Sequence, residues 1–309
     1  MSFPTYEFNS QHDGIVHCVK YDHYGKRVAT GGSDGLINIF QIDNPQKVTL
    51  LTQLNNGHTH SVWALSWSHP KYGNYLASCS YDNKIIIWKE TSANNWEIVY
   101  TYDKHTSSVN KCEFAPYQYG LILLCCSNDG SISLHEYKSE KTSWISNIYS
   151  KAHNSEVNSI SWGPALPPID FQEMDNGSRE DLAPMRFISG GNDGVLKVWV
   201  SHNNNIAGFE CKEIESKQVP IRDVAWMNYV GYSYDTVAVS RDDGSITIWK
   251  QKMNDPWEIT KEINIKKNGI KLSWSHCGTY LSACTAENEV HFYQENLDET
   301  WEEVQAPQF

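Results

Sequence analysis

An acidic residue followed six positions later by an aromatic residue or a histidine recurs six times, and this spacing constrains the fold more than any other feature. The pairs are Asp34–Phe40, Asp82–Trp88, Asp129–His135, Asp193–Trp199, Asp243–Trp249 and Glu287–Tyr293. Successive acids lie 48, 47, 64, 50 and 44 residues apart. A period of this size is typical of repeat architectures in which each repeat is one small structural unit. We therefore predict six copies of one unit.

The second copy shows what the unit is. After His58, runs rich in apolar, β-branched or aromatic residues occupy 62–67, 75–79, 85–88 and 96–100, and polar turn residues separate them. Runs of this length and composition between turns are typical of β-strands. Four such strands in succession predict one small antiparallel sheet.

Four polar or semi-polar side chains recur at fixed places in this unit. In the second copy they are His58, Ser78, Asp82 and Trp88. An Asp in a turn accepts hydrogen bonds from backbone N–H groups and from an imidazole, and the Ser hydroxyl and the indole N–H complete a chain of donors and acceptors. The fourth copy carries the second complete set: His153, Ser189, Asp193 and Trp199.

The other copies depart from this set. Thr30 replaces the serine in the first copy and Val239 in the fifth, while Lys217 and Ile265 stand where the fifth and sixth copies would have the histidine. Glu287 replaces the turn Asp in the sixth copy, which has the weakest set and is expected to be the least rigid.

His135 closes the third strand of the third copy, where the other copies have an aromatic residue. A single histidine is more often a tolerated surface or core residue than a ligand. We expect no second histidine or acid to join it.

These repeats resemble WD repeats, although Gly57-His58 is the only Gly-His pair and no closing aromatic is followed by Asp. The resemblance implies an all-β, six-bladed WD-repeat β-propeller that forms a single domain over residues 1–309. The expected blades are 12–54, 58–102, 105–149, 153–214, 217–263 and 265–304, with an insertion loop at 163–184.

Composition limits the function classes. The chain has 25 basic and 37 acidic residues, a net charge of −12, and this balance disfavours nucleic acid as a direct partner. Eight cysteines without a Cys-x-x-Cys spacing predict a reducing compartment and no metal site, and nothing indicates a cofactor. The N-terminus lacks the features of a signal peptide, and no apolar run is long enough to span a membrane.

The insertion at 163–184 is rich in proline and acidic residues, so it is expected to be a solvated loop. In an alternative interpretation, Phe171 and Met174 anchor a partner.

Strand counting points to a partner at the ends of the chain. Each third strand is followed by a fourth run, including one around Trp301 in the last blade, so no blade is left for the opposite terminus to complete. We expect an open propeller whose edge accepts strands from another protein. The expected partner-facing edge consists of Phe3, Tyr6, Phe8, Val290, Phe292 and Trp301.

The runs 69–90, 107–138 and 293–304 are similar to the Sec-thirteen family, the small propeller subunits of the COPII outer coat. This resemblance implies an open propeller completed by a seventh blade from an elongated α-helical scaffold subunit. It also implies a place on endoplasmic reticulum membranes and COPII vesicles, in the Y complex of the nuclear pore, and in a vacuolar or lysosomal nutrient-signalling complex. The Seh-one family of nuclear-pore propellers is the alternative relative.

The sequence offers two other function classes. His58, Ser78 and Asp82 resemble a hydrolase triad, but they recur in degraded form from copy to copy, whereas catalysis needs one constellation. The sequence therefore predicts no enzyme. The remaining alternative is an adaptor that reads peptides at the central channel, with Arg222 and Arg241 as candidate contacts.

Overall fold

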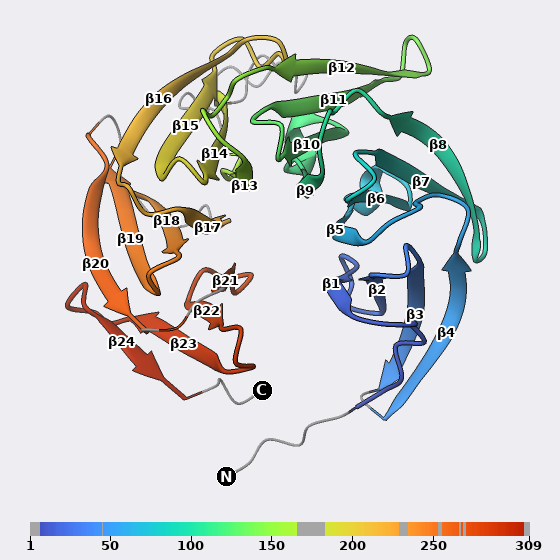
Figure 1. The fold of residues 1–309 in the computed structure, drawn as a ribbon, viewed down its shortest axis with the longest axis horizontal. Helices are drawn as coiled ribbons and strands as arrows, with labels where there is room; N and C mark the ends of the chain where they lie inside the picture. Colours follow the sequence, from blue (N-terminus) through green and yellow to red (C-terminus); the bar gives the residue numbers. More distant parts are fainter. Residues whose placement is uncertain are drawn as a thin grey trace, which may run out of the picture. The chain divides into compact units, whose positions relative to one another are not determined.

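Four consecutive strands form each sheet of this protein. The structure is a computed structural model that describes residues 7–44, 46–165, 183–228, 234–252, 255–265, 267 and 270–305. It has six four-stranded antiparallel sheets, each built in chain order (Figure 1). The predicted fold class, all-β with six propeller blades, is confirmed.

The chain divides into two compact units, Met1–Ile148 and Tyr149–Phe309, and each holds three blades. The expectation of a single domain stays a prediction. In unit 1, blade one is β1 (Val16–Tyr21), β2 (Arg27–Gly32), β3 (Ile37–Asn44) and β4 (Lys47–Leu54). Blade two is β5 (Val62–Trp67), β6 (Tyr75–Ser80), β7 (Ile85–Ser92) and β8 (Asn95–Tyr102). Blade three is β9 (Val109–Phe114), β10 (Ile122–Ser127), β11 (Ile132–Lys138) and β12 (Ser143–Tyr149).

Unit 2 repeats this plan. Blade four is β13 (Val157–Trp162), β14 (Met185–Gly191), β15 (Val195–Ser201) and β16 (Phe209–Ser216). Blade five is β17 (Ile221–Trp226), β18 (Tyr234–Arg241), β19 (Ser245–Lys252) and β20 (Glu258–Asn264). Blade six is β21 (Lys271–Trp274), β22 (Tyr280–Cys284), β23 (Val290–Glu295) and β24 (Trp301–Val304). Two short 3₁₀ turns, Pro70–Tyr72 and Tyr117–Tyr119, precede β6 and β10.

The turn between the second and third strand explains why the acid-to-aromatic spacing repeats. The residue after each turn acid has a positive φ, between 62° and 80°, which glycine and asparagine adopt at the lowest cost. These residues are Gly35, Asn83, Gly130, Gly194, Gly244 and Asn288. This turn sets the register in which the third strand returns to the second.

Cores lie between neighbouring blades of a unit. Leu65 and Trp88 of blade two pack with Ile39 of blade one, while Ile85 and Ile87, on the opposite face, pack toward blade three. Unit 2 has equivalent cores on both faces of blade five. Because side chains alternate between the faces of a strand, the middle blade of each unit is apolar on both faces.

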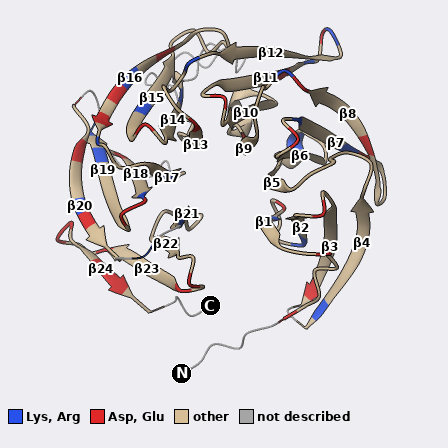
Figure 2. Cartoon of the chain, in the orientation of Figure 1, with Lys and Arg blue, Asp and Glu red and all other residues tan. Residues whose placement is uncertain are grey.

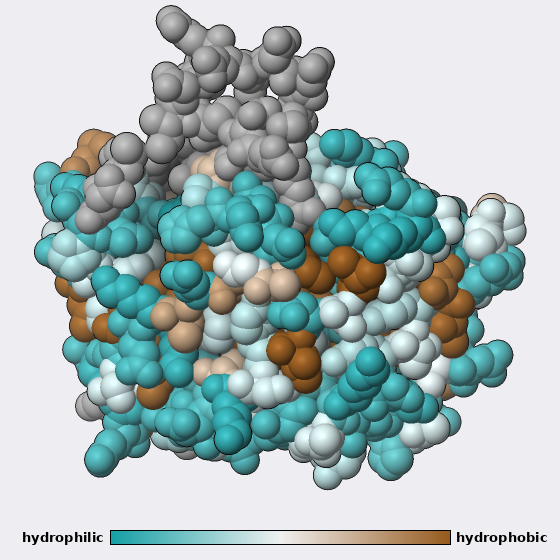
Figure 3. Space-filling model, turned by 90° about the horizontal axis from the view of Figure 1, so that it is seen from above, coloured by the Kyte–Doolittle hydropathy of each residue, from teal (hydrophilic) through white to brown (hydrophobic). Residues whose placement is uncertain are grey.

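Charged residues are frequent on the outer strands of unit 2. Figure 2 shows Asp and Glu on β16, β20 and β24, with a few Lys and Arg among them. On the face drawn in Figure 3, hydrophobic residues form small patches between hydrophilic ones. Phe3, Tyr6, Phe171 and Met174, and most of the 163–184 loop, lie outside the described residues.

Candidate functional sites: polar networks and exposed blade faces

Blade two carries the complete polar chain. Trp88 Nε1 donates to Ser78 Oγ at 3.0 Å, Ser78 Oγ lies 2.8 Å from His58 Nε2, and His58 Nδ1 lies 3.0 Å from the Asp82 carboxylate. The carboxylate also accepts the backbone N–H groups of Thr59 and Lys84. Each polar side chain of the set therefore has at least one hydrogen-bond partner within the blade.

The environment of Asp82 keeps it ionised. Burial alone would raise its pKa, but the hydrogen bond and the charge of His58, with the two backbone N–H groups, lower the pKa to about 2. The side chains of His58 and Asp82 are 0% and 4% exposed. The network therefore fixes the turn to the strands and is closed to a substrate.

Two other blades share this arrangement with small changes. In blade four, His153 lies 3.0 Å from Asp193 and 2.7 Å from Ser189 Oγ, which accepts from Trp199 Nε1 at 2.9 Å. In blade one, the hydroxyl of Thr30 lies 2.8 Å from Nε2 of His12. Hydrogen bonds outweigh burial and lower the pKa of Asp193, as in blade two.

Blade three corrects the expectation for His135. Its side chain is buried, and its Nε2 lies 2.9 Å from Ser133 Oγ, which lies 2.9 Å from His105 Nε2. The expectation that no second histidine joins His135 is therefore wrong. His105 Nδ1 lies 2.9 Å from Asp129, and Tyr100 OH lies 3.1 Å from His135 Nδ1, so five side chains form one chain.

The sequence contained a signal for this network that the spacing analysis missed. The bridging hydroxyl of Ser133 lies on the third strand, two residues before the closing residue, instead of on the second strand. Blade five has the same pattern, because Thr247 Oγ1 accepts from Trp249 Nε1 at 3.1 Å. Burial, with the charge of His105, lowers the pKa of His135 to about 3.

Blade five has a buried arginine at its boundary with blade four. Arg241 is 1% exposed, donates to the backbone oxygen of Val219 at 3.1 Å and forms an ion pair with Glu215. Arg222 forms an ion pair with Asp242. Both arginines were candidate contacts for a peptide. Each already pairs with a carboxylate of this chain, and the Arg241 side chain is buried in the interior.

Blade six has no such chain among its described residues. Glu287 pairs instead with Lys267, at 2.7 Å and largely in solvent. The Trp301 indole is buried, and its N–H has no hydrogen-bond partner in the described part of the chain.

Blade one has an exposed outer face, defined here as the side opposite to blade two. In blade two, Leu65 is fully buried against blade one, but the equivalent residue Val19 is 51% exposed. Tyr21, equivalent to Trp67, is exposed as well. Phe8 lies on Phe40 with ring centroids 5.2 Å apart and stays 44% exposed.

Blade six also has an outer face, opposite to blade five. Val290 is 52% exposed and Phe292 is half-buried, whereas their blade-two equivalents Ile85 and Ile87 are fully buried. Trp301 does not belong to this face. It is 4% exposed and packs on Trp274 with the core shared with blade five, because the strand directs it to the opposite side.

The cysteines, the possible metal ligands and the helices of the described residues each bear on the expectations from the sequence. Four of the eight cysteines are buried and three are exposed, and none forms a disulfide. In the described part of the chain, no cluster of three or more His, Cys, Asp or Glu could hold a metal ion. No helix among these residues has the length and apolar character needed to cross a bilayer.

Blades of this construction define the class of WD-repeat β-propellers. The family model for the WD domain, G-beta repeat, matches residues 3–41, 49–89 and 96–136. The chain belongs, more narrowly, to the SEC13 family. It is 36% identical over 296 residues to Protein SEC13 homolog of Drosophila melanogaster, which covers 96% of this chain and 82% of the relative.

Two fungal relatives agree with this assignment. Protein transport protein sec13 of Emericella nidulans is 34% identical over 305 residues, covering 96% of each chain. Protein transport protein SEC13-2 of Candida glabrata is 32% identical over 305 residues, covering 96% of this chain and 99% of the relative.

Proposed function

We propose that this chain is a non-catalytic scaffold subunit in protein transport. Membership of a family whose fungal relatives carry the name protein transport protein is the observation that carries the proposal. The particular assemblies proposed are the COPII outer coat and the Y complex of the nuclear pore. The subunit would act on the cytoplasmic side of endoplasmic reticulum membranes and COPII vesicles and at nuclear pores, with a vacuolar or lysosomal membrane as a further site.

The proposed partner is an elongated α-helical scaffold subunit that contributes a seventh blade. Among the described residues, the four strands of each blade are consecutive in the chain, so each of these sheets is complete without a strand from another part of the chain. The outer faces of blades one and six expose Val19 and Val290 at positions that are buried in the middle blade of unit 1. Exposed apolar residues on a sheet face support the packing of a further sheet against that face, as a seventh blade requires.

A scaffold role fits the chemistry of the polar sets. A hydrolase needs a nucleophile and a base that substrate can reach, yet the His58 side chain is fully buried and its hydroxyl partner, Ser78, is buried too. The same arrangement recurs in blade four. Repetition in separate blades indicates a structural device.

The experiment is co-purification of the helical subunit with wild-type chain and with Phe8→Asp and Val290→Asp. Both variants place a carboxylate on an outer face, so we expect each to reduce the recovered scaffold at least tenfold while the melting temperature stays within about 2 °C. Ile259→Asp is the matched control, because Ile259 on β20 of blade five is also 44% exposed and belongs to neither of these two faces.

Equal recovery with Phe8→Asp, Val290→Asp and Ile259→Asp would overturn the assignment of the binding faces. Purification of the wild-type chain without any helical scaffold subunit would overturn the proposed function itself.

A further inference from the structure

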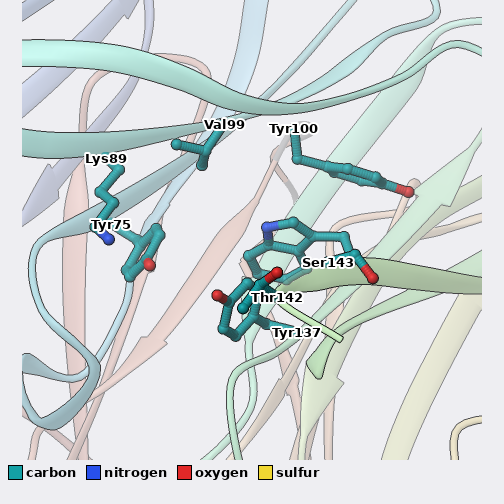
Figure 4. A pocket seen from close by; sticks show the side chains of 8 residues that line it. Tyr75, Lys89, Val99, Tyr100, Tyr137, Thr142 and Ser143 are labelled. Atoms are coloured by element: carbon teal, nitrogen blue, oxygen red, sulfur yellow. The ribbon is translucent and has the colours of Figure 1, made fainter. Parts of the chain in front are cut away.

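A cleft on the outer side of unit 1 lies between blades two and three. Its volume is about 420 Å³. Blade two contributes residues from β6, β7 and β8, and blade three contributes β11, β12 and the turn between them. Figure 4 shows Tyr75 and Lys89 on one side, with Tyr137 and Thr142 across from them. The lining residues are Tyr75, Lys89, Val99, Tyr100, Tyr137, Thr142, Ser143 and Trp144.

Aromatic rings form the walls. Trp144 stacks on Tyr100 with ring centroids 5.5 Å apart, and Tyr137 lies 5.6 Å from the same indole. The hydroxyl of Tyr100 lies 3.1 Å from Nδ1 of His135, which holds the ring in place. Rigid rings with polar tips bind a peptide at low entropic cost.

Lys89 is the only charged residue in this lining. Its ammonium lies 5.3 Å from the centroid of Tyr75, the side chain is half-buried, and it forms no ion pair among the described residues. Glu97 is its cross-strand neighbour, but the Glu97 carboxylate accepts from Thr91 Oγ1 at 3.2 Å. The Lys89 ammonium therefore has no carboxylate partner among the described residues, and a carboxylate supplied by a ligand can form a charge-assisted hydrogen bond with it.

Other boundaries between blades have a carboxylate that pairs with the cation. Arg27 of blade one pairs with Glu90 of blade two at 2.8 Å, and Arg186 of blade four pairs with Asp235 of blade five. At the boundary between blades five and six, Lys250 pairs with Glu295. Cation and carboxylate therefore meet at each of these boundaries.

The repeat makes the last of these pairs directly comparable with the cleft. Lys250 follows Trp249 as Lys89 follows Trp88, and Glu295 lies two residues after Tyr293 as Tyr137 lies two residues after His135. Tyr137 therefore stands where blade six has the carboxylate. The cleft has the cation of an interblade ion pair, with a tyrosine in place of the acid.

We propose that this cleft binds a linear peptide segment of a partner protein and receives an aspartate or glutamate side chain from it. The carboxylate pairs with Lys89, and a neighbouring apolar side chain of the segment packs on Tyr100 and Trp144. This site lies on the outer side of blades two and three, so it is separate from the outer face of blade one and does not depend on the proposed scaffold role.

The test begins with selection of a random 12-residue peptide display library on the full-length chain. The selected peptides are then labelled and their affinities measured by fluorescence anisotropy. We expect a consensus with an acidic residue next to an apolar one, and affinity that falls as salt rises.

Four variants locate the binding. Lys89→Gln should weaken the selected peptides at least tenfold, and Tyr137→Glu should weaken them as strongly because it supplies the carboxylate from within, as Glu295 does for Lys250. Tyr137→Phe should retain binding. Lys47→Gln is the matched control, because Lys47 is an exposed lysine of blade one that pairs with Asp43, and it should have no effect.

Circular dichroism melting of each variant separates lost binding from lost folding. A library that yields no peptide, a consensus without an acidic residue, or equal binding by wild type and a folded Lys89→Gln variant would each overturn the proposal.

Discussion

Blade two and blade six have the same topology but differ in what joins their strands. Blade two has strands of six to eight residues and a chain of four side chains from Trp88 to Asp82. Blade six has strands of four to six residues, and its turn acid pairs with a lysine near the surface.

This difference separates the features that specify a blade from those that stabilise it. Both blades keep the apolar positions that face a neighbouring blade, and both keep a residue with positive φ after the turn acid, Asn83 and Asn288. These two features are sufficient to specify a four-stranded blade. The buried polar chain adds stability and order to a sheet that the other features already specify.

The largest expected effect is the loss of the closing aromatic in blade two. Trp88→Ala should lower the free energy of unfolding by about 3–5 kcal/mol, because it opens a cavity in the core shared with blade one. Urea unfolding followed by circular dichroism measures this change.

A matched pair of milder variants isolates the hydrogen bond. Trp88→Phe removes an indole N–H that donates to Ser78, whereas Trp301→Phe removes an N–H without a partner among the described residues. The first should cost more than the second by about 1 kcal/mol. Equal costs would mean that the two blades differ in packing alone.

The next effect compares the two turn acids. Asp82→Ala should lower the free energy of unfolding by about 1–3 kcal/mol, because His58 and two backbone N–H groups lose a buried acceptor. Glu287→Ala removes a largely exposed pair and should leave the urea midpoint within experimental error. A comparable loss from Glu287→Ala would show that the ion pair with Lys267 replaces the polar chain of blade two.

The sequence was sufficient to predict the blades because the features that form them are local. The turn acid, the following Gly or Asn and the alternating apolar positions lie within a few residues of each other, so counting finds them. The partners in blades two and four also followed from spacing, because each member keeps its place in the repeat.

The remaining partners could not be found by equivalent position. Ser133 and Thr247 supply their hydroxyl from the third strand, and Arg241 is buried against Glu215 and Gly194 of the neighbouring blade. The face of the sheet on which Trp301 lies depends on the residue at which β24 begins. The sequence does not define that residue, and a shift of one position moves every side chain of a strand to the other face. The cleft beside Lys89 joins two blades, so only the structure brings its walls together.

The last expected effect concerns His135, which stands where blade two has Trp88. Its pKa is about 3 in the folded protein, against an ordinary value near 6.5, because burial and His105 disfavour the charged form. The unfolded chain therefore binds a proton at His135 below about pH 6.5 while the folded protein does not. The resulting stability is complete above pH 6.5 and is lost as the pH falls toward 3.

We expect the free energy of unfolding to fall less steeply with decreasing pH in His135→Phe than in the wild type between pH 6.5 and 4.5. The slope should differ by up to about 1.4 kcal/mol per pH unit, the contribution of one proton. Urea unfolding at a series of pH values measures this slope. Tyr100→Phe is the control, because it removes the hydroxyl that lies 3.1 Å from His135 Nδ1 and leaves the imidazole buried. It should lower stability at every pH without changing the slope.

An unchanged slope in His135→Phe would mean that His135 is protonated in the folded protein. Blade three would then have a buried cation in place of a neutral hydrogen-bond chain. It would differ from blade two as clearly as blade six does.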